Sequence, residues 1–136
     1  MKRIACRVRI LSEADGKKSL FSSEGFYSES EHGGEITCRP GGSPMVVGWI
    51  KEEVFIRRDG EVYLRLRLKE GEETEGEIGL SPETKGKVSV RTEKIAIGRS
   101  GKEIKIESEY VLRFDFGRQR MRIRLNAEER TGAIGE

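Results

Sequence analysis

Hydrophobic and polar positions alternate most clearly near the end of the chain. From Glu103 to Phe116 apolar residues occupy almost every second position, with charged residues between them. After Gly117 the alternation resumes in the opposite phase, with arginines between apolar residues up to Leu125. Because successive side chains of a strand point to opposite faces, both halves predict strands with one apolar and one charged face. A tight turn near residues 116–119 would join them into a hairpin whose apolar rows face the same way.

The same period of two runs through most of the chain. Asp15-Gly16 and Asp59-Gly60 are typical of tight turns, and the Pro- and Gly-rich stretch 40–44 predicts a loop. No segment has a long apolar period of 3.6 residues, so we expect about nine strands. Consecutive hairpins favour an up-and-down order. The expected fold is all-β, a closed or nearly closed antiparallel barrel of about 8–10 strands over residues 1–126, with 127–136 as a flexible tail.

Two segments leave alternatives open. Residues 45–50, MVVGWI, are apolar in both phases, so they form a strand covered on both sides, a short helical cap, or an exposed patch that joins two copies of the chain. Between Val90 and Ile95 the apolar phase slips by one residue. Either two strands meet at a corner there, or a β-bulge adds one residue and bends a single strand.

Composition narrows the classes of function. Lys and Arg total 26 against 24 Asp and Glu, a net charge of +2, which argues against a general polyanion binder. No apolar run approaches the roughly 20 residues that cross a bilayer, and the start lacks the apolar core of a signal peptide. We therefore expect a soluble, cytoplasmic protein with no membrane partner. In that compartment Cys6 and Cys38 are expected to be packed thiols rather than a disulfide.

Motifs for catalysis are not found in the sequence. The stretch from Gly98 to Lys102 departs from a phosphate-binding loop at both flanking positions, and it lies between strands, so it predicts a hairpin turn. His32 is the only histidine, and with the two cysteines it forms no set of metal ligands. No Gly-x-Ser-x-Gly nucleophile pattern occurs. We expect a protein that is not an enzyme and that has no metal or cofactor.

Two surfaces remain as candidate binding sites. Inside the barrel, polar groups near one mouth would contact a small, partly apolar ligand; the candidates are Arg91, Thr92 and Tyr110. Outside, an arginine-rich face on the last hairpin would bind the phosphates of a nucleic acid; its candidates are Arg113, Arg118, Arg120, Arg122 and Arg124. The ordinary alternative for these arginines, together with Arg57, Arg58, Arg65 and Arg67 on another hairpin, is cross-strand pairing with glutamates.

Several stretches resemble a known family. They are Arg91-Thr92 with Ile95 after it, Glu109-Tyr110 with Leu112, and less closely the segment SEGFYSE. Through the first two, which lie between about Phe55 and Phe114, and more loosely through SEGFYSE in the N-terminal half, the chain resembles the YwiB-like family of small uncharacterised bacterial proteins. The resemblance implies a calycin-type barrel, similar in shape to lipocalins, and no assigned activity or catalytic residues.

These observations predict an uncharacterised cytoplasmic β-barrel that holds a small, partly apolar ligand and does no catalysis. The alternative function is nucleic-acid or ribonucleoprotein binding through the arginines of the last hairpin. The chain is expected to be a monomer or a homodimer.

Overall fold

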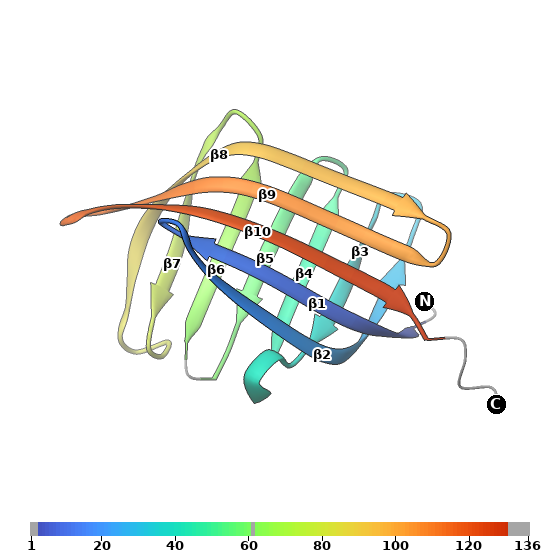
Figure 1. Ribbon diagram of the computed structural model, residues 1–136. Helices are drawn as coiled ribbons and strands as arrows, with labels where there is room; N and C mark the ends of the chain where they lie inside the picture. Colours follow the sequence, from blue (N-terminus) through green and yellow to red (C-terminus); the bar gives the residue numbers. More distant parts are fainter. Residues whose placement is uncertain (1–2, 61, 131–136) are drawn as a thin grey trace.

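The protein forms a ten-stranded antiparallel barrel in a computed structural model that describes residues 3–60 and 62–130 (Figure 1). Each strand pairs with the next along the chain, and the first pairs with the last, which closes the barrel. The expected all-β up-and-down barrel is therefore confirmed. In order the strands are β1 (Ile4–Ala14), β2 (Lys17–Glu29), β3 (Gly33–Cys38), β4 (Met45–Ile50), β5 (Glu53–Arg58), β6 (Tyr63–Lys69), β7 (Glu73–Gly79), β8 (Lys85–Ser100), β9 (Glu103–Phe114) and β10 (Gly117–Glu129).

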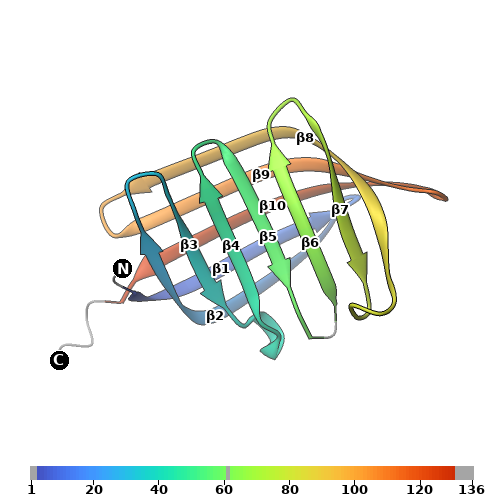
Figure 2. The ribbon, with the colours of Figure 1, turned by 180° about the vertical axis from the view of Figure 1, so that it is seen from behind.

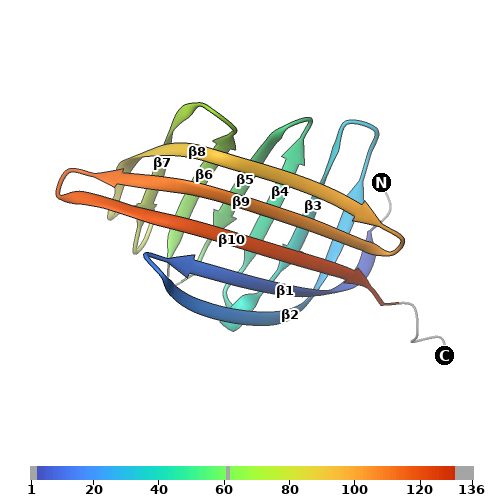
Figure 3. The ribbon, with the colours of Figure 1, turned by 45° about the horizontal axis from the view of Figure 1, so that its top comes forward.

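The strands form two layers. The long strands β8, β9, β10, β1 and β2 lie across the shorter strands β3 to β7, as the views from behind and from above show (Figures 2 and 3). A single-turn 3-10 helix, η1 (Pro40–Gly42), follows β3 at one end of the barrel. Within the residues that the structure describes, no helix is long and apolar enough to span a membrane.

Strand β8 belongs to both layers because of a β-bulge. It pairs with β7 from Lys85 to Arg91 and with β9 over most of its length, and its register to β9 shifts between Thr92 and Lys94. The bulge is the physical reason for the phase slip in the sequence, and it decides between the two alternatives in favour of one continuous, bent strand.

The core lies between the two layers. Inward residues of every strand contribute to it, among them Cys6, Val8, Leu68, Ile106 and Leu125, all at most 1% exposed. Apolar burial on this scale is the main stabilising contribution to such a barrel. Cys6 and Cys38 are buried and free, as expected.

The apolar segment 45–50 is strand β4. Met45, Val47 and Trp49 point into the core, while Ile50 is exposed. The helical cap and the cover on both sides are therefore wrong. The side chains of Met45, Val47 and Trp49 are buried, so an apolar surface patch that joins two copies of the chain cannot include them.

The last strand is longer than expected. β10 continues to Glu129, and Ala127 is fully buried opposite Val8 and Ile104. The predicted domain boundary at Asn126 is three residues short, because one small alanine among polar residues gives a weak alternation. The rest of the expected tail, residues 131–136, lies outside the described residues.

Several strands lack a neighbouring strand along part of one side, among them the long strands β2 and β8. β2 pairs with β3 only from Gly25 onward, so residues 17–24 pair with β1 alone. At the opposite corner, β8 leaves β7 after Arg91. There its edge meets the β6–β7 turn: Gly71 donates to the Thr92 carbonyl (2.9 Å), and the Ile95 amide donates to the Glu70 carboxylate (2.7 Å).

Candidate ligand-binding site

A cavity of about 130 Å³ lies inside the barrel where the edge of β2 is free. Strands of both layers and η1 contribute to its wall. Its lining residues are mostly apolar: Ile10, Ser12, Phe21, Pro40, Met45, Ile56, Arg58, Leu64, Tyr110, Met121 and Ile123. Phe21, on the free part of β2, is 37% exposed. Apolar walls with a few polar groups are the usual lining of a binding site for a small molecule.

Arg58 brings a positive charge to this apolar wall. It is the last residue of β5, and its side chain lies on the same face as the buried Val54 and Ile56. The residue is half-buried, and its Nε is buried without a hydrogen-bond partner. The expectation that Arg58 shares an outer arginine face with Arg57 is therefore wrong, because adjacent strand residues point to opposite faces.

Arg65 binds the carboxylate of Asp59, the residue that follows Arg58 in the chain. Its Nη2 donates to Asp59 Oδ1 at 2.9 Å, and its Nη1 donates to the carbonyls of Arg58 (3.0 Å) and Leu64 (2.8 Å). Its guanidinium also stacks on the Tyr63 ring, 4.3 Å from the ring centroid. These contacts fix Asp59 on Arg65, at the start of the β5–β6 turn.

Two other ionisable groups of the interior, Cys38 and Tyr110, are neutral near pH 7. Burial, and then the neighbouring Cys6, raise the pKa of the Cys38 thiol to about 11, although the charge of Arg58 acts in the opposite direction. Burial also raises the pKa of Tyr110 well above its usual value. Tyr110 therefore offers the cavity a neutral hydroxyl, and Cys38 supplies no negative charge to Arg58.

The structure separates the three residues predicted to contact a ligand. Tyr110 is buried and lines the cavity. Thr92 lies opposite Tyr110 on β8 and is also buried, but it does not line the cavity; its hydroxyl and that of Ser108 lack hydrogen-bond partners among the described residues. Arg91 is exposed on the outer face. Neighbouring residues of one regular strand segment cannot both face the interior, so Arg91 and Thr92 do not form one site.

The sequence did carry a signal for the missed residue. Val54, Ile56 and Arg58 share one phase, so alternation alone places Arg58 on the inner face. What the sequence could not supply is the cavity, because that depends on how seven strands and η1 pack around it.

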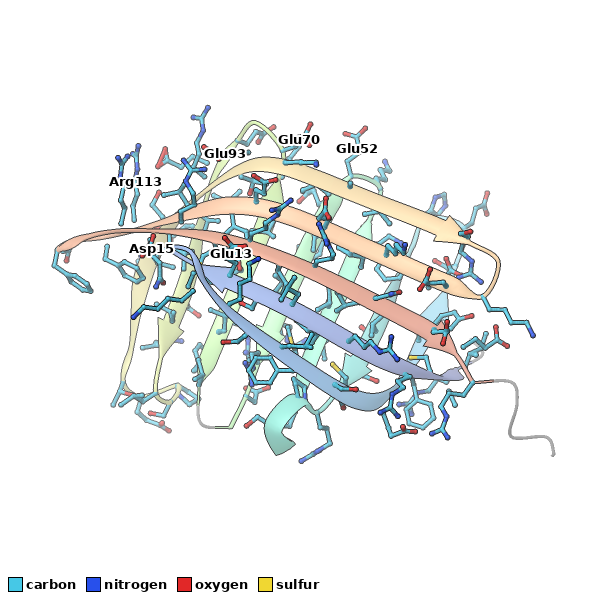
Figure 4. All side chains as sticks on the ribbon, in the orientation of Figure 1. Glu13, Asp15, Glu52, Glu70, Glu93 and Arg113 are labelled. Atoms are coloured by element: carbon cyan, nitrogen blue, oxygen red, sulfur yellow. The ribbon has the colours of Figure 1, made fainter. Side chains whose placement is uncertain are left out.

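The arginines of the last hairpin make ion pairs along the outer face. Arg120 pairs with Glu93 (2.7 Å), Arg122 with Glu109 (3.9 Å), Arg124 with Glu107 (2.7 Å) and Arg113 with Glu73 (3.7 Å); Arg113 and Glu93 are labelled in Figure 4. Arg118 makes no ion pair within the part of the chain that the structure describes. This is the cross-strand pairing expected of an ordinary charged face, and it leaves little uncompensated positive charge for phosphates.

Comparison with known proteins places the chain in a family. Residues 16–129 match the family described as a domain of unknown function, DUF1934. The chain belongs to this family. The crystal structure of the ywiB protein from Bacillus subtilis is similar, with a TM-score of 0.71 and 17% identity over 95% of this chain and 92% of that one. That likeness shows a shared barrel and confirms the YwiB-like resemblance; no curated protein matches the chain.

The DUF1934 description assigns no activity, so function must be argued from the cavity. The match begins within the β1–β2 turn and ends at Glu129, so it includes nine complete strands and most of the cavity wall.

Proposed function

We propose that this DUF1934 protein is a non-enzymatic, cytoplasmic barrel that holds a small, partly apolar ligand in the cavity beside β2. The observation that carries the proposal is the cavity of about 130 Å³ with an apolar wall. An engineered apolar cavity of about 150 Å³ in another protein binds benzene, so a space of this size suits a ligand of about one ring. Seven strands contribute to the wall, which gives the site a rigid frame.

The chemistry of the described residues supports binding rather than catalysis. Over residues 3–60 and 62–130, no carboxylate, histidine or thiol lines the cavity, so these residues offer it no pair of groups suited to general acid–base work. Among the described residues, no three His, Cys, Asp or Glu side chains gather as metal ligands. Two free, buried thiols agree with a reducing compartment.

The proposal is tested by adding neutral one-ring probes to isotope-labelled protein. Benzene or toluene should shift the methyl resonances of Ile10, Ile56 and Ile123, which line the cavity, and leave those of Ile95 and Ile97 unchanged. Native mass spectrometry of protein from its own host would show a retained small molecule.

A matched pair of variants locates the binding. Leu64→Trp should fill the mouth of the cavity and abolish the shifts. Leu80→Trp, at a position 75% exposed and outside the cavity, should leave them intact. Shifts that are absent in the wild type, or that survive Leu64→Trp, would show that the cavity is not a binding site.

A further inference from the structure

We propose that the ligand is a small monocarboxylate, whose anionic group binds Arg58 and the Tyr110 hydroxyl and whose apolar body, of about one ring, fills the cavity. This inference rests on the proposed function and names the chemical class of its ligand. It starts from the charge of Arg58, which has no ion-pair partner in the part of the chain that the structure describes.

A half-buried guanidinium is costly without an acceptor. Arginine presents five N–H donors and keeps its charge at any physiological pH. The Nε of Arg58 is shielded from water and has no acceptor, and Arg58 has no carboxylate partner among residues 3–60 and 62–130. An anionic ligand would replace the lost hydration with charge-assisted hydrogen bonds.

Among the residues that the structure describes, the carboxylates of the neighbouring elements have other partners. Asp59 is bound by Arg65, and Glu77 of β7 pairs with Lys85 and accepts from the Tyr63 hydroxyl. Around the cavity the remaining wall is apolar apart from two neutral hydroxyl groups, of Ser12 and Tyr110. The described residues of the cavity wall therefore carry one net positive charge, which a neutral ligand would not pair.

The number of donors and the volume favour a carboxylate over a phosphate. A carboxylate carries one charge and matches the planar fork of a single arginine. A phosphate monoester carries nearly two charges at pH 7 and three acceptor oxygens, and it is usually bound by several cations or by backbone amides. The cavity wall offers one cation and two hydroxyls, and about 130 Å³ leaves room for only one ring beside the anionic group.

The test compares three probes of nearly the same shape, benzoate, benzamide and phenyl phosphate, by calorimetry and by the methyl shifts described above. Benzoate should bind about tenfold or more tightly than neutral benzamide, because a hydrogen bond to a charged group contributes more than a neutral one. Phenyl phosphate should bind more weakly than benzoate. Equal binding of benzoate and benzamide would overturn the carboxylate while leaving the proposed function intact, and a preference for phenyl phosphate would assign the site to phosphate esters.

Variants of Arg58 test the inference, and the same change at its neighbour Arg57 is the matched control. Arg58→Met should abolish the preference for benzoate over benzamide, whereas Arg57→Met, one residue away on the outer face, should retain that preference. Arg58→Lys should retain part of the preference, because the charge remains without the planar fork. Benzoate binding that is unaffected by Arg58→Met would refute the inference, and failure of every probe with the wild type would refute the proposed function as well.

Discussion

Arg57 and Arg58 are neighbours with the same side chain and opposite surroundings. Arg57 is exposed, whereas Arg58 shares the inner face of β5 with core residues. Burying part of a charged side chain without a partner lowers stability, and natural proteins accept such costs mainly at functional sites. Variants of the two arginines therefore compare the stability cost of a half-buried charge with that of an exposed one.

Arg58→Met should stabilise the ligand-free protein, by about 1 kcal/mol in the free energy of unfolding, because it removes an unpaired, half-buried charge and adds apolar surface to the cavity wall. Urea denaturation measures the change. Arg57→Met should stay within about 0.5 kcal/mol of the wild type. If Arg58→Met destabilises the protein and Arg57→Met does not, then Arg58 has a stabilising partner in the fold.

Gly25 is required by a close approach of two backbones. It pairs with Cys6 of β1 and with Cys38 of β3, at the point where β2 acquires its second neighbour. A Cβ at this position would collide with the Thr37 carbonyl oxygen and crowd Val8.

Gly25→Ala should therefore destabilise the protein by roughly 2–3 kcal/mol, because the collision is with backbone that cannot move without breaking the β2–β3 ladder. Gly98 is the matched control, since it also lies within a strand but a Cβ there would meet no atom within 4 Å. Thermal unfolding of both alanine variants measures the difference. Equal melting temperatures would show that the backbone of β3 moves away from the added Cβ without loss of stability.

At the scale of the elements, β8 shows what alternation can and cannot predict. The phase slip between Val90 and Ile95 located the bulge to within two residues, because burial imposes one phase on each side of it. The same reasoning gave the strands and most of the core. It could not show that β8 leaves β7 after Arg91, since pairing between distant strands has no local signal.

The exposed edge of β8 depends on Glu70. Its carboxylate accepts the Ile95 amide, and it lies close to Glu52 along this edge, where both line one surface hollow (Figure 4). Glu70→Ala should destabilise the protein by about 1 kcal/mol and speed hydrogen exchange of the Ile95 amide. Glu52 makes no hydrogen bond with another described residue, so Glu52→Ala should change neither the stability nor the exchange rate. Unchanged exchange at Ile95 in Glu70→Ala would show that water replaces the carboxylate without cost.

At the scale of the whole molecule, the charged exterior is ordered by many ion pairs rather than by one cationic region. The hydrogen bond from Arg67 lowers the pKa of Glu53, and those from Arg124 and then Lys94 lower that of Glu107. Carboxyls with a lower pKa in the folded protein stabilise it above their unfolded pKa of about 4.3, and this contribution is lost as pH falls through the folded values.

The melting temperature should therefore stay level between about pH 5 and 8 and fall below about pH 4.3. Arg124→Met should make the acid fall less steep. Lys87→Met should not, because the pair of Lys87 with Glu75 is long (3.7 Å) and both side chains are more than two-thirds exposed. Identical acid profiles for the two variants would show that Glu107 is not shifted.

The loss of stability between about pH 8.5 and 10 comes from the buried thiols of Cys6 and Cys38. Burial raises the pKa of Cys6 and Cys38 to about 11, so their contribution to stability is complete below the unfolded value of about 8.5 and is lost as pH rises toward 11. Replacing both cysteines with alanine should flatten the melting temperature between pH 8.5 and 10. A slope that persists in this variant would assign the alkaline loss to other groups.

The pairing of β1 with β10 sets the order in which the protein can assemble. These strands join residues near opposite ends of the sequence, from Cys6 with Glu129 to Ala14 with Met121. Each hairpin, that of β1 and β2 included, can form as soon as its two strands have been synthesised, but the β1–β10 ladder must wait for the last strand. Closure of the barrel is therefore the last pairing step to become possible, and the long separation in sequence between β1 and β10 predicts slow folding.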